Sequence, residues 1–209
     1  MPRGRFITLE GGEGAGKSTQ VKKLAAFLRG KGIDTVQTRE VGGSPSAEAI
    51  RDLWLAPKDG HWDAMTELLL INAARREHLV KTVFPALDAG QWVVCDRFAD
   101  STRAYQGVGL GLGMDAADSV YRLIAPGFEP DLTLLLDLPV EEGLARMAAR
   151  GGQDDRYQQK PAAFHQKLRD AYLALADTHK NRFRVIDAAH DPATVAASIE
   201  QAVRAWFGL

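Results

Sequence analysis

Short apolar runs alternate along the chain with longer segments in which apolar residues recur every three or four positions. A short apolar run bounded by glycine or polar residues is typical of a buried strand, and the wider spacing is typical of an amphipathic helix. On this basis we predict five strands, at residues 6–9, 35–38, 91–95, 132–136 and 183–186.

The segments between these strands have the spacing of helices. In the first of them Val21, Leu24 and Leu28 recur at helical spacing before Gly30 ends the pattern. In the longest, Pro85 predicts a bend or a restart. The first predicted helix runs from about residue 17 to Gly30, and the others cover residues 46–56, 65–87, 115–124, 140–150, 161–180 and 192–207. A glycine-rich loop is predicted at 107–113 and a polar loop at 151–159.

Strands that alternate with helices and lack polar alternation indicate a parallel sheet with helices on both faces. The predicted fold class is therefore α/β with a five-stranded parallel sheet. Ligands of such sheets bind beyond the C-terminal ends of the strands, where Glu40, Asp96, Arg97 and Asp137 stand. Because the 209 residues include no linker, repeat or low-complexity tract, we expect a single domain, 1–209.

Composition and charge narrow the class of protein. A net charge of −1 from well-mixed charged residues argues against a surface that binds nucleic acid. No apolar stretch is long enough to span a bilayer and the first residues lack a signal-peptide pattern, so we expect a soluble cytoplasmic protein without a membrane partner. Cys95 is the single cysteine, which excludes an internal disulfide, and its place in the run WVVC predicts a buried strand residue.

A phosphate-binding loop follows the first predicted strand. Residues 11–18 fit G-x-x-x-x-G-K-[S/T], with a strand before them and a helix after them. Backbone N–H groups of such a loop turn toward polyphosphate oxygens, Lys17 would reach the β- and γ-phosphates, and the Ser18 hydroxyl would bind Mg²⁺. The plain alternative is a tight strand-to-helix turn with a solvated lysine. The predicted ATP-binding residues are Gly11, Gly12, Glu13, Gly14, Ala15, Gly16, Lys17, Ser18 and Thr19.

A phosphate-binding loop by itself does not separate a switch from a kinase. The D-x-x-G switch of GTPases is absent, and so is a Lys followed two positions later by Asp, the pair that reads guanine, which makes a GTPase improbable. The chain instead carries arginines at strand ends and in the polar loop. Arginine grips phosphate oxygens bidentately, and phosphoryl transfer depends on positioning and charge neutralisation. These arginines are Arg39, Arg75, Arg97, Arg146, Arg150 and Arg156.

At this point the motifs carry a resemblance that covers essentially the whole chain. The segments are LEGGEGAGKST from Leu9, TREVGG from Thr38, AAR ending on Arg75, DRF from Asp96, STRAYQG from Ser101, PDLTLLLD from Pro130, ARGGQDDR at 149–156 and VIDA at 185–188. STRAYQG after the DRF triplet is the most specific of them. The sequence resembles the bacterial-type thymidylate kinases, which are nucleoside monophosphate kinases with a phosphate-binding loop.

The resemblance implies a reaction and roles for particular residues. The expected reaction is transfer of the ATP γ-phosphate to dTMP with Mg²⁺, giving dTDP and ADP for dTTP synthesis. Arg39 and Arg97 would clamp the acceptor phosphate, and Glu13 would read the sugar 3′-hydroxyl. Arg75 and Gln106 would hydrogen-bond the thymine edge, Ser101 would line the base pocket, and Tyr105 would occupy the space of a ribose 2′-hydroxyl. Ser18 would bind the metal. Asp96 would lie near the metal and its waters and is also expected among the substrate-binding residues.

The resemblance also implies a mobile lid at about 150–160. The phosphate-binding loop contains no basic residue between Gly11 and Gly16, so the chain is similar to family members that carry the catalytic arginine in the lid. Arg150, with Arg156 as the alternative, is expected to stabilise charge on the transferring phosphoryl group. The predicted catalytic residues are thus Lys17, Arg97, Arg150 and Arg156.

Two positions depart from the family pattern. Val41 stands where family members usually have proline, and Ile71 stands where an aromatic residue usually stacks on thymine. Isoleucine can cover a base by dispersion but lacks the π surface of a stacking ring.

Alternatives to thymidylate kinase activity remain at this stage. They are a kinase for dUMP, UMP or CMP and a non-catalytic nucleotide-dependent switch. Family members generally pair through helices, so the resemblance also implies a homodimer.

Overall fold

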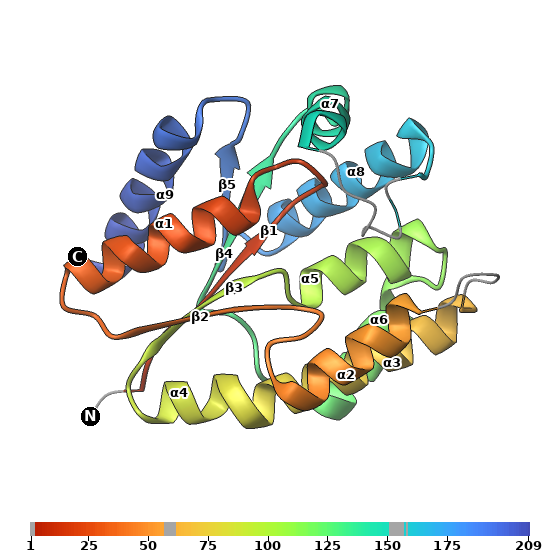
Figure 1. Ribbon diagram of the computed structural model, residues 1–209, viewed down its shortest axis with the longest axis horizontal. Helices are drawn as coiled ribbons and strands as arrows, with labels where there is room; N and C mark the ends of the chain where they lie inside the picture. Colours follow the sequence, from red (N-terminus) through yellow and green to blue (C-terminus); the bar gives the residue numbers. More distant parts are fainter. Residues whose placement is uncertain (1–2, 57–61, 151–156, 158) are drawn as a thin grey trace.

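A five-stranded parallel sheet lies at the centre of the computed structural model, which describes residues 3–56, 62–150, 157 and 159–209 (Figure 1). Its strands stand in the order β2-β3-β1-β4-β5, and every neighbouring pair is parallel. The strands are β1 (Phe6–Glu10), β2 (Thr35–Arg39), β3 (Trp92–Asp96), β4 (Leu132–Asp137) and β5 (Phe183–Asp187). All five predicted strands and their parallel arrangement are confirmed.

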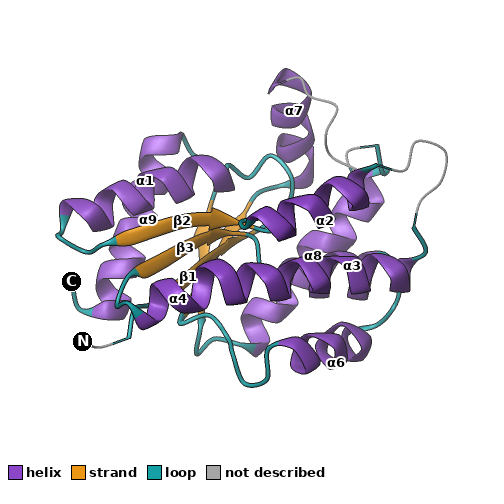
Figure 2. Cartoon of the chain, turned by 60° about the horizontal axis from the view of Figure 1, so that its bottom comes forward, coloured by secondary structure: helices purple, strands orange, loops and turns teal. Residues whose placement is uncertain are grey.

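Helices connect these strands and cover both faces of the sheet (Figure 2). The α-helices are α1 (Lys17–Gly30), α2 (Pro45–Leu55), α3 (Ala64–His78), α4 (Phe84–Asp88), α5 (Ala99–Thr102), α6 (Met114–Ile124), α7 (Val140–Arg150), α8 (Ala162–Thr178) and α9 (Pro192–Phe207), and two π-helical segments are η1 (Leu79–Val83) and η2 (Arg103–Gly109).

The core lies on both sides of the sheet because alternate strand residues point to opposite faces. On one face Ile7 and Leu134 pack against α1 and α9 through residues such as Leu24 and Ile199. On the other face Phe6 packs against Phe98 and the residues of η1 and α4. The central strands β1 and β4 are buried almost throughout, whereas the edge strands β2 and β5 each carry exposed as well as buried residues.

Pro85 ends one helical segment and begins another, as predicted. The backbone runs from α3 through the π-helical η1 into α4, where Pro85 stands in the first turn. A proline there needs no partner for the N–H that it lacks, and the wider π turn accommodates the change of helix.

The segment after β3 differs from the sequence prediction. Residues 99–109 form α5 and η2, although no helix was predicted there, and residues 107–109 of the predicted glycine loop belong to η2. The start of that loop was therefore predicted wrongly. The segment is held by buried ion pairs, because Asp100 is fully buried and accepts hydrogen bonds from Arg103 and Arg182. These partners lie up to 82 positions away, so a local pattern could not indicate them.

Within the ranges that the structure describes, no helix combines the length and apolar character needed to cross a bilayer.

The packing of β4 generates a stability prediction. Leu134 is fully buried in the apolar cluster that the sheet forms with α1 and α9, so Leu134→Ala should lower the free energy of unfolding by about 2–5 kcal/mol through lost contacts and a residual cavity. Urea denaturation measures this change. The matched control is Val185→Ala on the edge strand β5, where the side chain is half exposed and the loss should stay below about 1 kcal/mol. Equal losses in the two variants would contradict the assigned core.

Candidate active site

The phosphate-binding loop passes from β1 to α1 at the C-terminal edge of the sheet, with Gly16 before the first helical residue. At two positions of this loop glycine is required, because the backbone of another element lies too close for a Cβ atom. A Cβ on Gly11 would lie 2.4 Å from the carbonyl oxygen of Leu136, and one on Gly14 would lie 2.2 Å from that of Gly143 in α7. Both glycines also have positive φ angles, of 138° and 71°, which side chains disfavour. The loop is therefore wedged between β4 and α7.

Lys17 begins α1 and turns its side chain back over the loop. Its Nζ donates to the carbonyl oxygens of Gly11 at 3.0 Å and Gly12 at 2.7 Å. Burial, followed by the charge of Arg97, lowers the pKa of the Lys17 ammonium below its usual range. A buried cation beside loop amides suits a polyphosphate anion.

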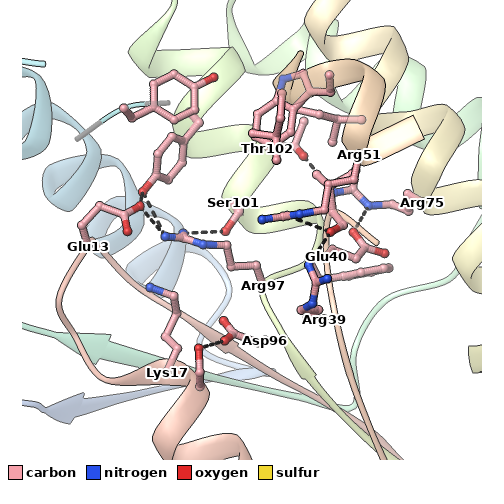
Figure 3. A pocket seen from close by; sticks show the side chains of 18 of the residues that line it. Glu13, Lys17, Arg39, Glu40, Arg51, Arg75, Asp96, Arg97, Ser101 and Thr102 are labelled. Carbon is pink, nitrogen blue, oxygen red and sulfur yellow. Dashed lines mark hydrogen bonds and ion pairs between the residues drawn. The ribbon is translucent and has the colours of Figure 1, made fainter. Parts of the chain in front are cut away.

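Ser18 and Asp96 bring two oxygen ligands together. The Ser18 hydroxyl donates to Oδ2 of Asp96 at 2.6 Å, and Asp96 ends the neighbouring strand β3 (Figure 3). In the part of the chain that the structure describes, no group of three His, Cys, Asp or Glu side chains could hold a metal. Magnesium takes one or two protein oxygens and completes its shell with waters and phosphates, so this donor pair fits Mg²⁺.

Arg97 follows β3 and lies at the middle of the site. Its φ angle is +67°, which is uncommon for a residue other than glycine and is found at functional sites. One guanidinium nitrogen donates to Glu13 at 2.5 Å and to the Tyr105 hydroxyl at 3.2 Å, and the other donates to the carbonyl of Gly11 and the hydroxyl of Ser101. Burial opposes the charge, but Glu13 outweighs it and raises the pKa of Arg97, so the cation persists.

Glu10 fixes the loop that presents Arg97. This fully buried carboxyl at the end of β1 accepts from the backbone N–H of Phe98 at 2.8 Å and from the Ser101 hydroxyl at 2.5 Å. The Tyr172 hydroxyl from α8 is 3.4 Å away. Burial, together with the nearby charge of Asp100, raises the pKa of Glu10 to about 7. The carboxyl thus ties the phosphate-binding loop to the start of α5.

A second cationic group surrounds Glu40, just beyond β2. Arg75, only 2% exposed, donates from Nε to Oε2 of Glu40 at 2.7 Å, while His78 bonds the other oxygen at 2.9 Å. Burial raises the pKa of Glu40, but Arg75 and then His78 outweigh it, so the pKa lies below its usual range. Arg39 is half exposed and pairs with both oxygens of Glu48.

A cavity of about 400 Å³ joins these groups. Its floor is the phosphate-binding loop, and its far end is lined by Ile71, Arg75, Ser101, Tyr105 and Gln106, all predicted from the sequence. Such a volume is typical of small-molecule sites. Glu13 stands between the two ends, because its carboxylate also accepts a hydrogen bond from Tyr105 at 2.5 Å.

The structure therefore brings most of the predicted site residues around one cavity. Lys17, Arg39, Asp96 and Arg97 line it together with part of the loop. The loop residues in the lining are Glu13, Gly14, Gly16, Ser18 and Thr19, whereas the predicted Gly11, Gly12 and Ala15 are not part of it. The predicted lid arginine Arg156 lies outside the described residues, and the side chain of Arg150 at the end of α7 is likewise not described.

Sequence reasoning missed several residues that line the cavity. Arg51 lies on α2 and donates to the carbonyl oxygen of Val41 at 2.9 Å, and Trp54 stands one turn further along the same helix. Thr102 and Tyr157 were also missed. Arg51 and Trp54 were missed because they fit the amphipathic pattern of a helix. In such a pattern an arginine is expected on the solvent-exposed face and a tryptophan in the core.

Comparisons with known proteins agree with this geometry. The thymidylate kinase family model matches residues 9–199. A thymidylate kinase of Rhizorhabdus wittichii is 48% identical over 204 residues, which are 97% of this chain and 98% of the relative. One from Pseudomonas putida is 51% identical over 197 residues, covering 94% and 93%. The chain belongs to the thymidylate kinase family.

A solved structure supports the same membership. The crystal structure of the Ehrlichia chaffeensis thymidylate kinase is 31% identical and superposes with a TM-score of 0.80, covering 97% of this chain and all of that one. The fold expected from the resemblance, a five-stranded parallel sheet of the nucleoside monophosphate kinase type, is thus confirmed for this family member.

Glu10 generates a pH prediction. Its pKa rises from 4.5 to about 7 on folding, so the native state binds the extra proton between these values. The associated stability is fully present below pH 4.5 and is lost as pH rises through about 7. The loss should be on the order of 3 kcal/mol. Glu10→Gln should remove this slope in urea denaturation at a series of pH values.

The matched control for Glu10→Gln is Glu141→Gln, which changes an exposed carboxyl on α7 and should leave the pH slope as in the unmodified protein. A Glu10→Gln variant with an unaltered slope would contradict the assignment of that titration to Glu10.

Proposed function

We propose that the protein transfers the γ-phosphoryl group of ATP, with Mg²⁺, to dTMP, giving dTDP and ADP, a step toward dTTP. One observation carries this proposal beyond family membership. The donor loop and a cationic acceptor pocket open into the same cavity, and Glu13 and Arg97 stand at their junction. A non-catalytic switch needs no such acceptor pocket.

At the donor end, the loop amides and Lys17 would hold the β- and γ-phosphates. Ser18 and Asp96 offer the oxygens that would hold Mg²⁺, which supplies positive charge to the phosphates during transfer. The buried ammonium of Lys17 would exchange the carbonyl oxygens that it contacts for phosphate oxygens. Charge neutralisation and in-line positioning account for most of the rate in this reaction class.

At the acceptor end, Arg97 and Arg39 would bind the phosphate of dTMP, and Glu13 would receive the sugar 3′-hydroxyl. Arg97 donates five hydrogen bonds and keeps its charge. Because its side chain is already ordered, it would bind the phosphate with little further loss of conformational entropy. Arg39 is half exposed and bonded to Glu48, so a phosphate would compete with that carboxylate for it.

At the base end, Arg75 and Gln106 would hydrogen-bond the thymine edge, while Ile71 covers its face. Tyr105 would exclude a ribose 2′-hydroxyl from the space beside Glu13. Ser101 would act as a support in this pocket, because its hydroxyl is committed to Glu10 and lies 3.3 Å from Arg97.

The homodimer expected from the resemblance stays a prediction. Half-exposed Leu53 and Leu69 on the outer surfaces of α2 and α3 are compatible with a partner there. The single-domain organisation with a mobile lid at 150–160 also stays a prediction.

The proposed reaction is tested by ADP release from ATP and Mg²⁺ in a coupled assay with dTMP, dUMP, UMP, CMP and dCMP. We expect the highest kcat/KM with dTMP. Exclusion of a hydroxyl by a close-fitting pocket discriminates roughly 10²-fold, so ribonucleotides should be slower by about that factor. Turnover of another monophosphate above dTMP would favour the alternative pyrimidine kinases, and no release with any would favour a switch.

The catalytic arginine is tested by Arg150→Ala and Arg156→Ala. Arginines that stabilise the transferring phosphoryl group contribute roughly 10³–10⁵ in rate in related enzymes, so one of these variants should lose kcat in that range. The matched control is Arg146→Ala, because Arg146 also lies on α7 but donates to the carbonyl oxygen of Ala188, the residue after β5. Near-normal turnover in both lid variants would refute the assignment.

A further inference from the structure

Hydrogen bonds to Glu67 and Tyr157 hold the side chain of Gln106 in the wall of the cavity. Gln106 is 2% exposed, and its Nε2 donates to Oε1 of Glu67 at 2.8 Å and to the hydroxyl of Tyr157 at 2.9 Å. The Tyr157 hydroxyl donates to the same oxygen of Glu67. Glu67 comes from α3 and is 1% exposed, whereas Tyr157 follows α7 in the chain.

This arrangement decides which way the amide of Gln106 faces. A carboxylate oxygen only accepts hydrogen bonds, and an amide nitrogen only donates them. The reverse orientation would place the amide oxygen of Gln106 against the Glu67 oxygen, so that two buried acceptors would face each other with no proton to share. Two buried oxygens that face each other in this way repel, and the hydrogen bond from the amide nitrogen is lost. The nitrogen therefore faces Glu67, and the carbonyl oxygen faces away from it.

We propose that Glu67, with Tyr157, determines base specificity by holding Gln106 so that an acceptor oxygen meets the Watson–Crick edge of the substrate base. This inference rests on the proposed function, because it concerns the base end of the dTMP pocket. Thymine presents a donor at N3–H and an acceptor at O4. Cytosine presents the opposite pattern, an acceptor at N3 and a donor at its amino group.

Arg75 supplies the complementary half of this recognition. A guanidinium only donates, and three of its N–H groups are taken by Glu40, Asn72 and Thr102. Five are available, so two remain for an acceptor such as O4 of thymine. Arginine cannot change from donor to acceptor, whereas a glutamine amide can do so by turning over. Glu67 therefore controls the part of base recognition that depends on the orientation of the Gln106 amide.

Replacement of Glu67 should free the amide of Gln106. In Glu67→Met the acceptor is lost, and the Tyr157 hydroxyl can be satisfied by donating to Oε1 of a reversed Gln106. The reversed amide would offer its N–H to N3 of cytosine. In Glu67→Gln both orientations of the two amides can pair, so the preference weakens without being reversed.

The test measures kcat/KM for dTMP, dCMP and dUMP in the wild type and these two variants. We expect the dTMP/dCMP ratio to fall at least about tenfold in Glu67→Met and by a smaller factor in Glu67→Gln. Because uracil shares the N3–H and O4 pattern of thymine, the dTMP/dUMP ratio should stay within about twofold of the wild type. Tyr157→Phe keeps the Glu67 acceptor and should change the dTMP/dCMP ratio less than Glu67→Met.

Several outcomes would overturn the inference. An unchanged dTMP/dCMP ratio in Glu67→Met would show that the amide is oriented by other groups. Parallel changes in the dUMP and dCMP ratios would show that Glu67 only maintains the shape of the pocket. If Glu67→Met fails to fold by thermal melting, Glu67→Gln carries the test, and an unchanged ratio in it is then the refuting result. A wild-type enzyme that does not favour dTMP would instead refute the proposed function.

Discussion

The buried carboxyl of Glu10 is the point on which the rest of the site depends. It ends the central strand β1 and bonds the first residues after β3, so two neighbouring strand ends become one unit. The phosphate-binding loop starts on one side of this unit, and Arg97 stands on the other. The sheet thereby fixes where the phosphate-binding loop and Arg97 stand relative to each other, because adjacent parallel strands are about 4.8 Å apart.

Three arginines that line the cavity are each paired with a carboxylate of the protein. Arg97 pairs with Glu13, Arg75 with Glu40 and Arg39 with Glu48. A buried guanidinium without a partner would destabilise the fold, so these pairs let the pocket exist before a nucleotide arrives. The three pairs differ in exposure, and therefore in how readily a substrate anion can replace the carboxylate. The half-exposed pair of Arg39 is the easiest to exchange, and the buried pair of Arg75 is the most permanent.

The sequence predicted the sheet, the phosphate-binding loop and most of the cavity lining because each of these leaves a local signal. Phe6 to Thr19 combine a strand, a glycine loop and a helix start within 14 positions. The segment Ala99–Gly109 escaped prediction because its stability comes from long-range partners, such as Arg182 for Asp100. Glu67 and Tyr157 escaped for the same reason, since they stand 90 positions apart in the sequence although their side chains are hydrogen-bonded in the fold. The roles of Arg150 and Arg156 rest on resemblance, and no local pattern ranks one above the other.

The contact between Gly14 and Gly143 has a consequence for how the sequence can vary. A side chain at the first position would strike the carbonyl oxygen of Gly143, and one at the second would come within 2.5 Å of the carbonyl oxygen of Glu13. Gly143 lies inside α7, where alanine would favour the helix by about 1 kcal/mol. Glycine at this position lowers the intrinsic stability of the helix, but it allows the backbone of α7 to pack directly against the phosphate-binding loop. Two positions 129 residues apart therefore form one steric unit, and a tolerated change at either would have to be accompanied by a shift of the whole helix.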